Sequence, residues 1–234
     1  MTEKGIASAV ASVVLRVSGA YLIGAVPFAN IVARASSGED LRSVGNGTVS
    51  STGVYRVAGA GAFAVSCALD IGKGALAASL AGGCDPALAA AAVGLAIAGH
   101  NWSPFLRGAG GRGVLPGIGA LLVIAPSGSA LLLSGLAAGW SADNTALGCF
   151  AAQSLLVPVL GRAKGRKGVM LAAAVAGPML VKRLLGNEPL PCAAWPERGR
   201  AYLTRVIYDR DPGPDRRLRP PGRTGRGPVS RVCS

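Results

Sequence analysis

Two polar segments of the sequence combine glycine with arginine, a pairing that suits phosphate groups. The first, residues 38–53, places Gly45, Asn46 and Gly47 shortly after Arg42. Its other candidate ligands are hydroxyl side chains and one further cation: Thr48, Ser50, Ser51, Thr52 and Arg56. Backbone N–H groups of a glycine-rich turn can converge on an anion, and a helix that starts there adds its positive dipole end. The segment therefore indicates a phosphate cradle, although by itself it fits a plain hydrophilic loop better.

A second segment, residues 107–113, has the sequence Arg-Gly-Ala-Gly-Gly-Arg-Gly. Gly110, Gly111 and Gly113 offer backbone donors, and Arg112 offers a planar guanidinium that can bind a phosphate through two hydrogen bonds. A flexible loop whose arginines face the cytoplasm is the alternative interpretation. Two such segments at the same membrane depth favour a pair of phosphate sites.

Three further ionisable residues stand within or at the end of apolar runs. Asp70 and Lys73 are three residues apart, which places them on one helix face where they can pair. Charged residues at membrane depth usually face a polar cavity, so the pair predicts the lining of a site, with a purely structural ion pair as the close alternative. His100 is the only histidine, which excludes multi-histidine metal sites. It could donate to a phosphate or shuttle a proton, and a structural role is the alternative.

The elements that hold these residues are predicted to be membrane helices. Half of the 234 residues are apolar, only 15% are charged, and the net charge is +13. Such an apolar chain cannot be disordered, and a soluble domain of this composition would lack the polar residues to cover its surface. The five cysteines are widely spaced and form no close pair typical of metal or disulfide sites.

Runs with few or no charges define the predicted helices, because a bilayer core of about 30 Å needs roughly 20 apolar residues. The runs cover residues 5–33, 57–81, 86–106, 114–141, 144–161 and 168–185. Run 114–141 could form two short passes hinged at Pro126 or one tilted pass. The predicted fold class is an all-α, polytopic membrane helix bundle of about seven helices, with six as the alternative. Glycine and alanine dominate the runs, which favours close helix packing, although a GC-rich genome would produce the same composition.

The domain boundary is predicted near residue 190, between a membrane domain (1–190) and a basic tail (191–234). From Glu197 onward, ten arginines accompany four acidic residues among repeated prolines and glycines. We expect this tail to be disordered and attracted to anionic lipid headgroups. We expect no nucleic acid as a partner, because stacking aromatic residues are few. The tail's charge places it in the cytoplasm, but the equally basic loop 162–167 is one span away, so only one of the two can obey the positive-inside rule.

In their order along the chain, these features resemble the bacterial acyl-phosphate:glycerol-3-phosphate acyltransferases, integral membrane enzymes of phospholipid synthesis. Residues 21–28 resemble the family's opening signature, residues 40–56 its first motif and residues 69–74 its Asp-Lys-Gly helix. Residues 99–114 resemble the second motif, with Arg112 where the family has lysine, and residues 182–189 resemble the close of the third. The resemblance covers residues 20–190.

The resemblance implies transfer of a fatty acyl group from acyl phosphate to the primary hydroxyl of glycerol 3-phosphate, giving lysophosphatidate without a cofactor or metal. It also implies a multi-pass protein of the bacterial plasma membrane, with its active site facing the cytoplasm and membrane lipid around it. The catalytic residues would be Arg42, Lys73 and Arg112. One phosphate would bind Arg42, Arg56 and residues 45–53, and the other would bind Arg112 with Gly110, Gly111 and Gly113, while His100 would orient the second segment.

The chain departs from the family pattern at several motif positions. Ala25 replaces a serine, Thr48 and Gly53 replace asparagines, Ser50-Ser51 replaces Gly-Ala, and Gly177 and Leu180 replace a histidine and an asparagine. These replacements motivate an alternative function, a catalytically weakened homologue that binds phosphorylated lipid precursors and regulates or scaffolds lipid synthesis. A small-solute transporter is a third alternative, but it would show an inverted repeat between the halves of the chain, and the sequence has none.

Overall fold

The computed structural model describes residues 2–45, 47–82, 85–186 and 195–209, and this part of the chain contains helices but no strand. The α-helices are α1 (Glu3–Ala25), α2 (Phe28–Ser37), α3 (Ser51–Leu80), α4 (Pro86–Asn101), α5 (Val114–Ile124), α6 (Pro126–Ser141), α7 (Thr145–Leu185) and α8 (Trp195–Tyr208). Two short 3-10 helices, η1 (Leu41–Ser43) and η2 (Pro104–Leu106), lie in the connections. The predicted all-α fold class is confirmed.

Prolines divide two of the predicted runs. A proline lacks the N–H group that a helix interior requires, but it is tolerated where a helix starts. Run 5–33 is interrupted at Pro27, between α1 and α2, so the prediction of one continuous helix is wrong there. Run 114–141 divides at Ala125, and Pro126 starts α6. For this run, the structure confirms the alternative of two short helices.

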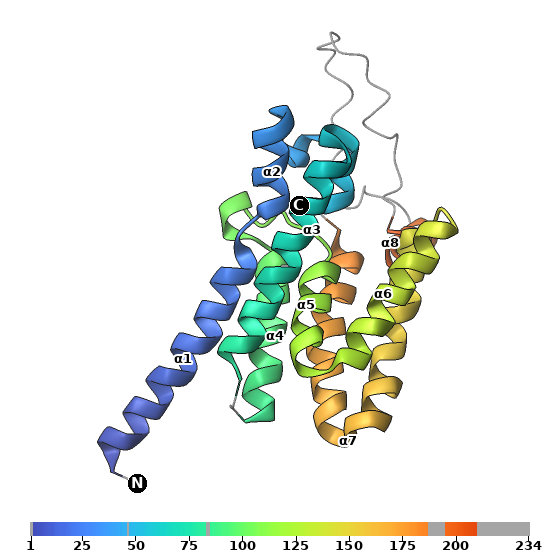
Figure 1. Cartoon of the computed structure of the whole chain (residues 1–234). Helices are drawn as coiled ribbons and strands as arrows, with labels where there is room; N and C mark the ends of the chain where they lie inside the picture. Colours follow the sequence, from blue (N-terminus) through green and yellow to red (C-terminus); the bar gives the residue numbers. More distant parts are fainter. Residues whose placement is uncertain (1, 46, 83–84, 187–194, 210–234) are drawn as a thin grey trace.

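Two glycines bend the chain sharply inside long helices. Gly165 has φ 57° and ψ −141° within α7, a backbone conformation that is open mainly to glycine. The two halves of α7 consequently run side by side in opposite directions (Figure 1). The predicted runs 144–161 and 168–185 are thus the two arms of one helical hairpin. Gly59, with φ 79° and ψ −173°, similarly bends α3 after its first turns.

Other glycines set the spacing between neighbouring helices. A Cβ atom added to Gly24 of α1 would lie 1.9 Å from the carbonyl oxygen of Ala96 in α4. A Cβ atom on Gly74 of α3 would lie 2.0 Å from the carbonyl oxygen of Pro116 in α5. No side chain fits at these distances, so these glycines permit α1 to pack on α4 and α3 on α5. At these positions glycine serves close helix packing, one of the two interpretations that the composition allowed.

The core lies between α4, α5, α6 and α7. Its fully buried side chains include Ile97, Leu121, Leu132, Leu156, Leu160, Val175 and Met179. Large apolar side chains are also exposed on the outer surface, among them Leu15, Leu122 and Leu155. Within the described residues, three helical stretches are long and apolar enough to cross a membrane: Glu3–Ser37, Ser51–Leu80 and Thr145–Leu185. An apolar exterior around a bundle of small residues suits a lipid environment. The count of about seven membrane helices stays a prediction.

The C-terminal region differs from expectation in one stretch. Residues 195–208 form α8, which packs on α7, whereas the sequence predicted a disordered tail from residue 191. Ala201 and Arg205 are buried in this contact, and the long stem of an arginine can cover apolar surface. Residues 187–194 and 210–234 lie outside the described part, so the domain boundary near residue 190 stays a prediction.

One end of the bundle gathers the polar segments. Figure 1 shows α2, the connection from α2 to α3, the connection from α4 to α5, and α8 at this end. The turn inside α7 lies at the opposite end. The basic loop 162–167 and α8 therefore lie at opposite ends of the bundle, and which of them faces the cytoplasm stays a prediction.

Candidate active site

The two glycine-rich segments meet at this end of the bundle. We call the connection between α2 and α3 loop 1 (residues 38–50) and the connection between α4 and α5 loop 2 (residues 102–113). The amide of Val49 in loop 1 donates a hydrogen bond of 3.1 Å to the carbonyl oxygen of Gly110 in loop 2. A Cβ atom on Gly111 would lie only 2.7 Å from the carbonyl oxygen of Val49. The two predicted phosphate segments are therefore in direct contact.

Loop 2 folds back onto the C-terminal end of α4. The Gly111 amide donates a hydrogen bond of 3.2 Å to the carbonyl oxygen of His100. A Cβ atom on Gly110 would lie 2.3 Å from that same oxygen, and one on Gly111 would lie 2.2 Å from His100 Nε2. Gly113 has φ 77° and ends the loop where α5 begins. These glycines let loop 2 pack against His100, and the Gly111 amide is used inside the protein rather than offered to an anion.

Loop 1 and the first turns of α3 surround a small hollow. The residues that line it are Leu41, Val44, Gly45, Thr48, Ser50, Gly53 and Arg56. Four of the predicted ligands, Gly45, Thr48, Ser50 and Arg56, thus share one hollow. Hydroxyl groups and a guanidinium beside a helix N-terminus have the chemistry of an anion site.

Two predicted ligands of loop 1 have structural partners that the sequence did not reveal. The Ser50 hydroxyl accepts a hydrogen bond from the Gly53 amide at 3.2 Å and so caps α3. The Gly47 amide donates to the carbonyl oxygen of Val44 and closes a tight turn. Part of the polar capacity of loop 1 therefore serves the loop's own shape.

Two further predicted ligands, Ser51 and Thr52, do not line the hollow. The Ser51 hydroxyl is buried, 2.8 Å from the hydroxyl of Ser66 across the bend of α3. Thr52 is half-buried in the first turn of α3 and is not part of the lining. Asn46 lies outside the described residues. The structure thus separates the hydroxyl groups that were predicted to act together.

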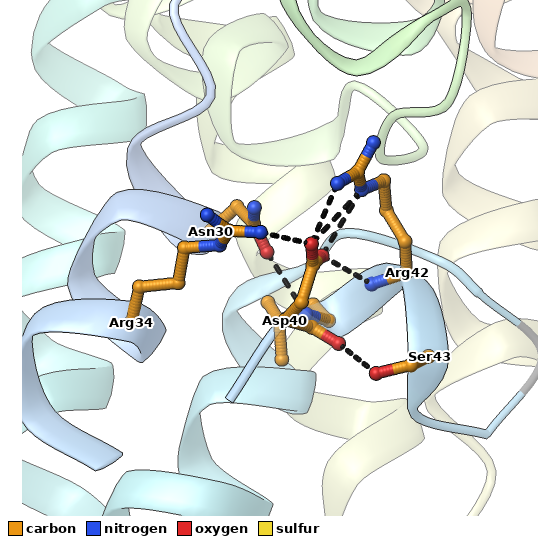
Figure 2. A network of polar contacts seen from close by, with 6 residues as sticks. Asn30, Arg34, Asp40, Arg42 and Ser43 are labelled. Atoms are coloured by element: carbon orange, nitrogen blue, oxygen red, sulfur yellow. Dashed lines mark hydrogen bonds and ion pairs between the residues drawn. The ribbon is translucent and has the colours of Figure 1, made fainter. Parts of the chain in front are cut away.

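Arg42 directs its guanidinium at Asp40 instead of the hollow. Its Nη2 lies 2.6 Å from Asp40 Oδ2, and its Nε lies 3.1 and 3.2 Å from the two carboxylate oxygens. Arg34 pairs with the same carboxylate (Figure 2). The hydrogen bond from Arg42 is the main reason that the pKa of Asp40 lies well below its ordinary value, and the same bond raises the pKa of Arg42. Arg42 is therefore ion-paired and does not line the hollow.

Asp70 and Lys73 form the ion pair that their spacing predicted. Lys73 Nζ lies 2.8 Å from Asp70 Oδ1, and both side chains are at most 2% exposed. Lys73 also donates a hydrogen bond of 2.8 Å to the carbonyl oxygen of Val26. His100 Nδ1 is 3.7 Å from the same Asp70 oxygen, too far for a hydrogen bond. Lys73 and His100 thus approach one buried carboxylate, and His100 also contacts loop 2.

Arg112 is bound by a residue from the far end of the chain. Its Nη2 lies 2.7 Å from Asp209 Oδ1, and its Nε donates a hydrogen bond of 3.0 Å to Asp209 Oδ2. Its Nη1 donates to the carbonyl oxygen of Lys182 at 3.0 Å. Lys182 Nζ lies 3.4 Å from the carbonyl oxygen of Gly108 and 5.3 Å from the centre of the Trp102 ring. Lys182 therefore lies against loop 2, close to Arg112 within that loop.

The sequence did not lead us to Asp40, Asp209 or Lys182. Asp40 stands two residues before Arg42, a spacing that could have indicated the pair. Asp209 carries no local signal, because only the fold brings it to Arg112. Lys182 ends an apolar run, where lysine is expected simply to reach toward the membrane surface. Each of the three predicted catalytic cations is paired with an aspartate: Arg42, Lys73 and Arg112.

Comparison with known proteins matches this chain to one family. Residues 14–182 match the family described as glycerol-3-phosphate acyltransferase. The glycerol-3-phosphate acyltransferase of Roseobacter denitrificans is 34% identical over 171 residues, which cover 71% of this chain and 84% of the relative. Glycerol-3-phosphate acyltransferase 3 of Dehalococcoides mccartyi is 31% identical over 206 residues, which cover 76% of this chain and 95% of the relative.

Two solved structures share the fold. The crystal structure of PlsY (YgiH), an integral membrane glycerol 3-phosphate acyltransferase, in its glycerol 3-phosphate form, has a TM-score of 0.68 and 24% identity. This similarity covers 84% of the present chain and 94% of PlsY. The lysophosphatidic acid form of PlsY has a TM-score of 0.65 and 22% identity, covering 74% and 88% of the two chains. The predicted membrane helix bundle is thereby confirmed.

Proposed function

The chain belongs to the glycerol-3-phosphate acyltransferase family, and from this membership we propose that it moves a fatty acyl group from acyl phosphate to the primary hydroxyl of glycerol 3-phosphate. The product is lysophosphatidate, a precursor of phospholipids. Both substrates carry a phosphate group, so the reaction requires two anion sites side by side. The observation that carries the proposal is the direct contact between loop 1 and loop 2.

The transfer needs little acid–base chemistry from the protein. The hydroxyl oxygen of glycerol 3-phosphate attacks the acyl carbonyl carbon and forms the ester bond. The bond between that carbon and the phosphate oxygen breaks, and the hydroxyl proton leaves with the released phosphate. Phosphate is a good leaving group, so positioning of the substrates and stabilisation of the developing charge can supply most of the acceleration.

The geometry supports a division of roles between the loops. One phosphate would bind in the hollow of loop 1, near Arg56, Thr48 and Ser50. Arg42 binds Asp40, but its side chain remains 37% exposed, so its positive charge would also act on a phosphate in the hollow. The second phosphate would bind Arg112 at loop 2. Gly110, Gly111 and Gly113 would shape this second site, and His100, which contacts Gly111, would position it.

Lys73 is proposed to act from between the two loops. It is tied to Val26 at the end of α1 and to Asp70, and the same carboxylate faces His100 behind loop 2. A cation in a site shielded from water stabilises developing negative charge more strongly than one in bulk water. Lys73 would therefore stabilise the charge that builds up as the acyl–phosphate bond breaks.

We further propose that the protein lies in the bacterial plasma membrane with both loops facing the cytoplasm. Helix α8, with Arg198, Arg200 and Arg205, lies at the same end of the bundle as the loops. Arginines beside membrane spans favour the cytoplasmic side. The loops would then face the compartment in which glycerol 3-phosphate is made, and the basic tail would face anionic headgroups.

Membranes that contain the expressed chain provide the test. With acyl phosphate and glycerol 3-phosphate, we expect lysophosphatidate and inorganic phosphate in equal amounts, and neither product when one substrate is omitted. Formation of lysophosphatidate without release of phosphate would contradict the assignment of the donor.

One observation favours a second candidate function, a catalytically weakened homologue that regulates or scaffolds lipid synthesis. Gly177 and Leu180 of α7 stand where the resembled family has a histidine and an asparagine, and neither residue can donate or accept through its side chain. In the same membranes, retained binding of glycerol 3-phosphate with no turnover would support this candidate over the enzyme.

A further inference from the structure

Helix α8 and Asp209 lie beyond the family match yet reach loop 2. The match ends at residue 182, whereas α8 covers residues 195–208 and Asp209 follows it directly. Arg205 donates a hydrogen bond of 2.9 Å to the carbonyl oxygen of Leu185, and Arg183 donates one of 3.1 Å to the carbonyl oxygen of Val206. These bonds fasten α8 to the end of α7. A segment beyond the residues of the family match thus delivers a carboxylate to Arg112.

Three cations, two of them buried, gather at this contact. Lys182 is 1% exposed and Arg183 is 2% exposed, and the side chain of Arg112 is 10% exposed. Among the described residues, Asp209 is the carboxylate that pairs with this cluster, and it binds Arg112. Counted over the described residues, three cations against one carboxylate leave an excess of two positive charges. Buried charges in such an excess are costly unless an anion joins them.

The two remaining cations have few partners of their own. The Nε atom of Arg183 has no hydrogen-bond partner within the described part of the chain. Lys182 Nζ has one hydrogen-bond acceptor there, the carbonyl oxygen of Gly108, at the long distance of 3.4 Å. A lysine ammonium can donate three hydrogen bonds and a guanidinium five, so both groups retain capacity for an anionic ligand.

A phosphate group matches this cluster in charge and in geometry. A phosphate monoester or an acyl phosphate carries up to two negative charges, so in place of Asp209 it offsets two of the three positive charges, whereas the carboxylate offsets one. Asp209 engages two nitrogen atoms of Arg112 with two oxygen atoms, which is how arginine also grips a phosphate. The carboxylate and the phosphate would therefore compete for the same edge of one guanidinium.

We propose that Arg112, Lys182 and Arg183 form one anion site and that Asp209 is its internal ligand, which a phosphorylated substrate displaces. This inference rests on the proposed function, because it takes the displacing ligand to be one of the two phosphorylated substrates. The apparent dissociation constant for that substrate equals its intrinsic value divided by the fraction of molecules in which Asp209 does not hold the site. Helix α8 thereby sets the substrate concentration at which the enzyme responds.

Asp209→Asn provides the first test, because it removes the charge and keeps the size of the side chain. The full-length variant in membranes is assayed for KM and kcat with each substrate. If Asp209 holds the site in nine molecules of ten, we expect KM for one substrate to fall about tenfold while kcat stays constant. Asp209→Glu keeps a carboxylate and should resemble the wild type. Asp143→Asn, at an exposed aspartate that forms no ion pair within the described residues, is the control of equal charge.

Lys182 is tested by two substitutions. Lys182→Met should raise KM about tenfold for the same substrate that Asp209→Asn affects, and Lys182→Arg should retain most of the wild-type affinity. A purely structural lysine over Trp102 would instead lower the stability and the yield of the protein without selecting one substrate. If Lys182→Met changed KM equally for both substrates, Lys182 would not belong to the proposed site.

A binding experiment with inorganic phosphate tests this inference independently of the proposed function. Phosphate should raise the melting temperature of the purified protein more in Asp209→Asn than in the wild type. This result would support the internal ligand even if the wild type transferred no acyl group. Unchanged phosphate binding, or a KM at or above the wild-type value in Asp209→Asn, would overturn it whatever the activity of the wild type.

Discussion

The amide of Val49 donates a hydrogen bond to the carbonyl oxygen of Gly110 over 3.1 Å, and this bond joins loop 1 to loop 2. The two loops come from different helix connections, so the bond fixes one proposed phosphate site relative to the other. Acyl transfer between two phosphorylated substrates depends on such fixed geometry, because a small misplacement of either substrate slows the reaction steeply. The glycine beside this bond is therefore a direct place to test the arrangement.

We expect Gly111→Ala to disrupt the contact between the loops. The new Cβ atom would lie 2.2 Å from His100 Nε2 and 2.7 Å from the carbonyl oxygen of Val49. Forcing an extra methyl group into a packed site costs about 1–3 kcal/mol, and here it also pushes the two loops apart. The melting temperature of the protein and its kcat in membranes should both be lower than in the wild type.

Gly72→Ala is the matched control for that substitution. Gly72 lies in α3 with open space where a Cβ atom would stand. An alanine there adds helix propensity of up to about 1 kcal/mol and meets no neighbour. We expect unchanged or slightly higher stability and normal activity. If both alanine variants behaved alike, crowding at loop 2 would not be the cause.

Arg112→Ala should weaken the binding of one phosphorylated substrate. A charge-assisted hydrogen bond contributes about 1.5–3 kcal/mol, which corresponds to a rise in KM of about 10- to 100-fold. Arg112→Lys keeps the charge but loses the two-pronged geometry, so we expect an intermediate KM. The same assays with Arg112→Ala in an Asp209→Asn background show how much of the effect comes from leaving Asp209 unpaired.

Arg42→Ala provides the parallel test at loop 1. Arg42 is bound to Asp40 and stands outside the hollow, so we expect a smaller rise in KM than for Arg56→Ala. Wild-type kinetics in both Arg42→Ala and Arg112→Ala would remove the two arginines from the substrate sites.

The pairing of Asp40 with Arg42 should make the free energy of unfolding depend on pH. Because the pKa of Asp40 is lower in the folded chain than in the unfolded chain, the ionised carboxylate stabilises the fold above the ordinary aspartate pKa of about 3.9. That stabilisation is lost as the pH falls from the ordinary aspartate pKa through the lower pKa that Asp40 has in the folded chain. Asp40→Asn should be less stable than the wild type at pH 7, and the difference should shrink in acid.

Equilibrium unfolding between pH 7 and strongly acidic pH measures this difference. Glu39→Gln is the control, since Glu39 is the exposed neighbour and forms no ion pair among the described residues. It should keep the acid dependence of the wild type. If the free energy of unfolding depended on pH in the same way in the wild type and in Asp40→Asn, the ion pair would not stabilise loop 1.

Residues with local effects made much of the fold predictable. Pro126 marked the division between α5 and α6 because a proline starts helices and interrupts them. The bend at Gly165 lies in the basic loop 162–167, which the sequence already placed between two apolar runs. The bend at Gly59 could not be singled out, because it lies inside run 57–81 and the chain has 35 glycines. Helix α8 was missed because its arginine-rich sequence resembles a solvated tail, and its order depends on contacts with α7.

The candidate site was predictable to the extent that its residues are neighbours in sequence. The spacing of Asp70 and Lys73 indicated their ion pair, and glycine with arginine indicated both loops. The pairing of Arg112 with Asp209 depends on the course of the whole chain, and no periodicity or motif encodes it. Tertiary contacts of this kind determine which cation is available to a substrate.

The pair of Asp70 and Lys73 allows a structural role to be separated from a catalytic one. Removing one partner leaves a buried charge alone, so Asp70→Asn or Lys73→Met should each destabilise the protein by about 3–5 kcal/mol. The double variant leaves no buried charge and should recover most of that loss, as measured by thermal unfolding. If Lys73 stabilises charge during acyl transfer, the double variant will be folded but will retain a strongly reduced kcat, with KM changed far less. Recovery of activity together with stability would instead assign the pair to structure, because a catalytic ammonium cannot be replaced by a thioether.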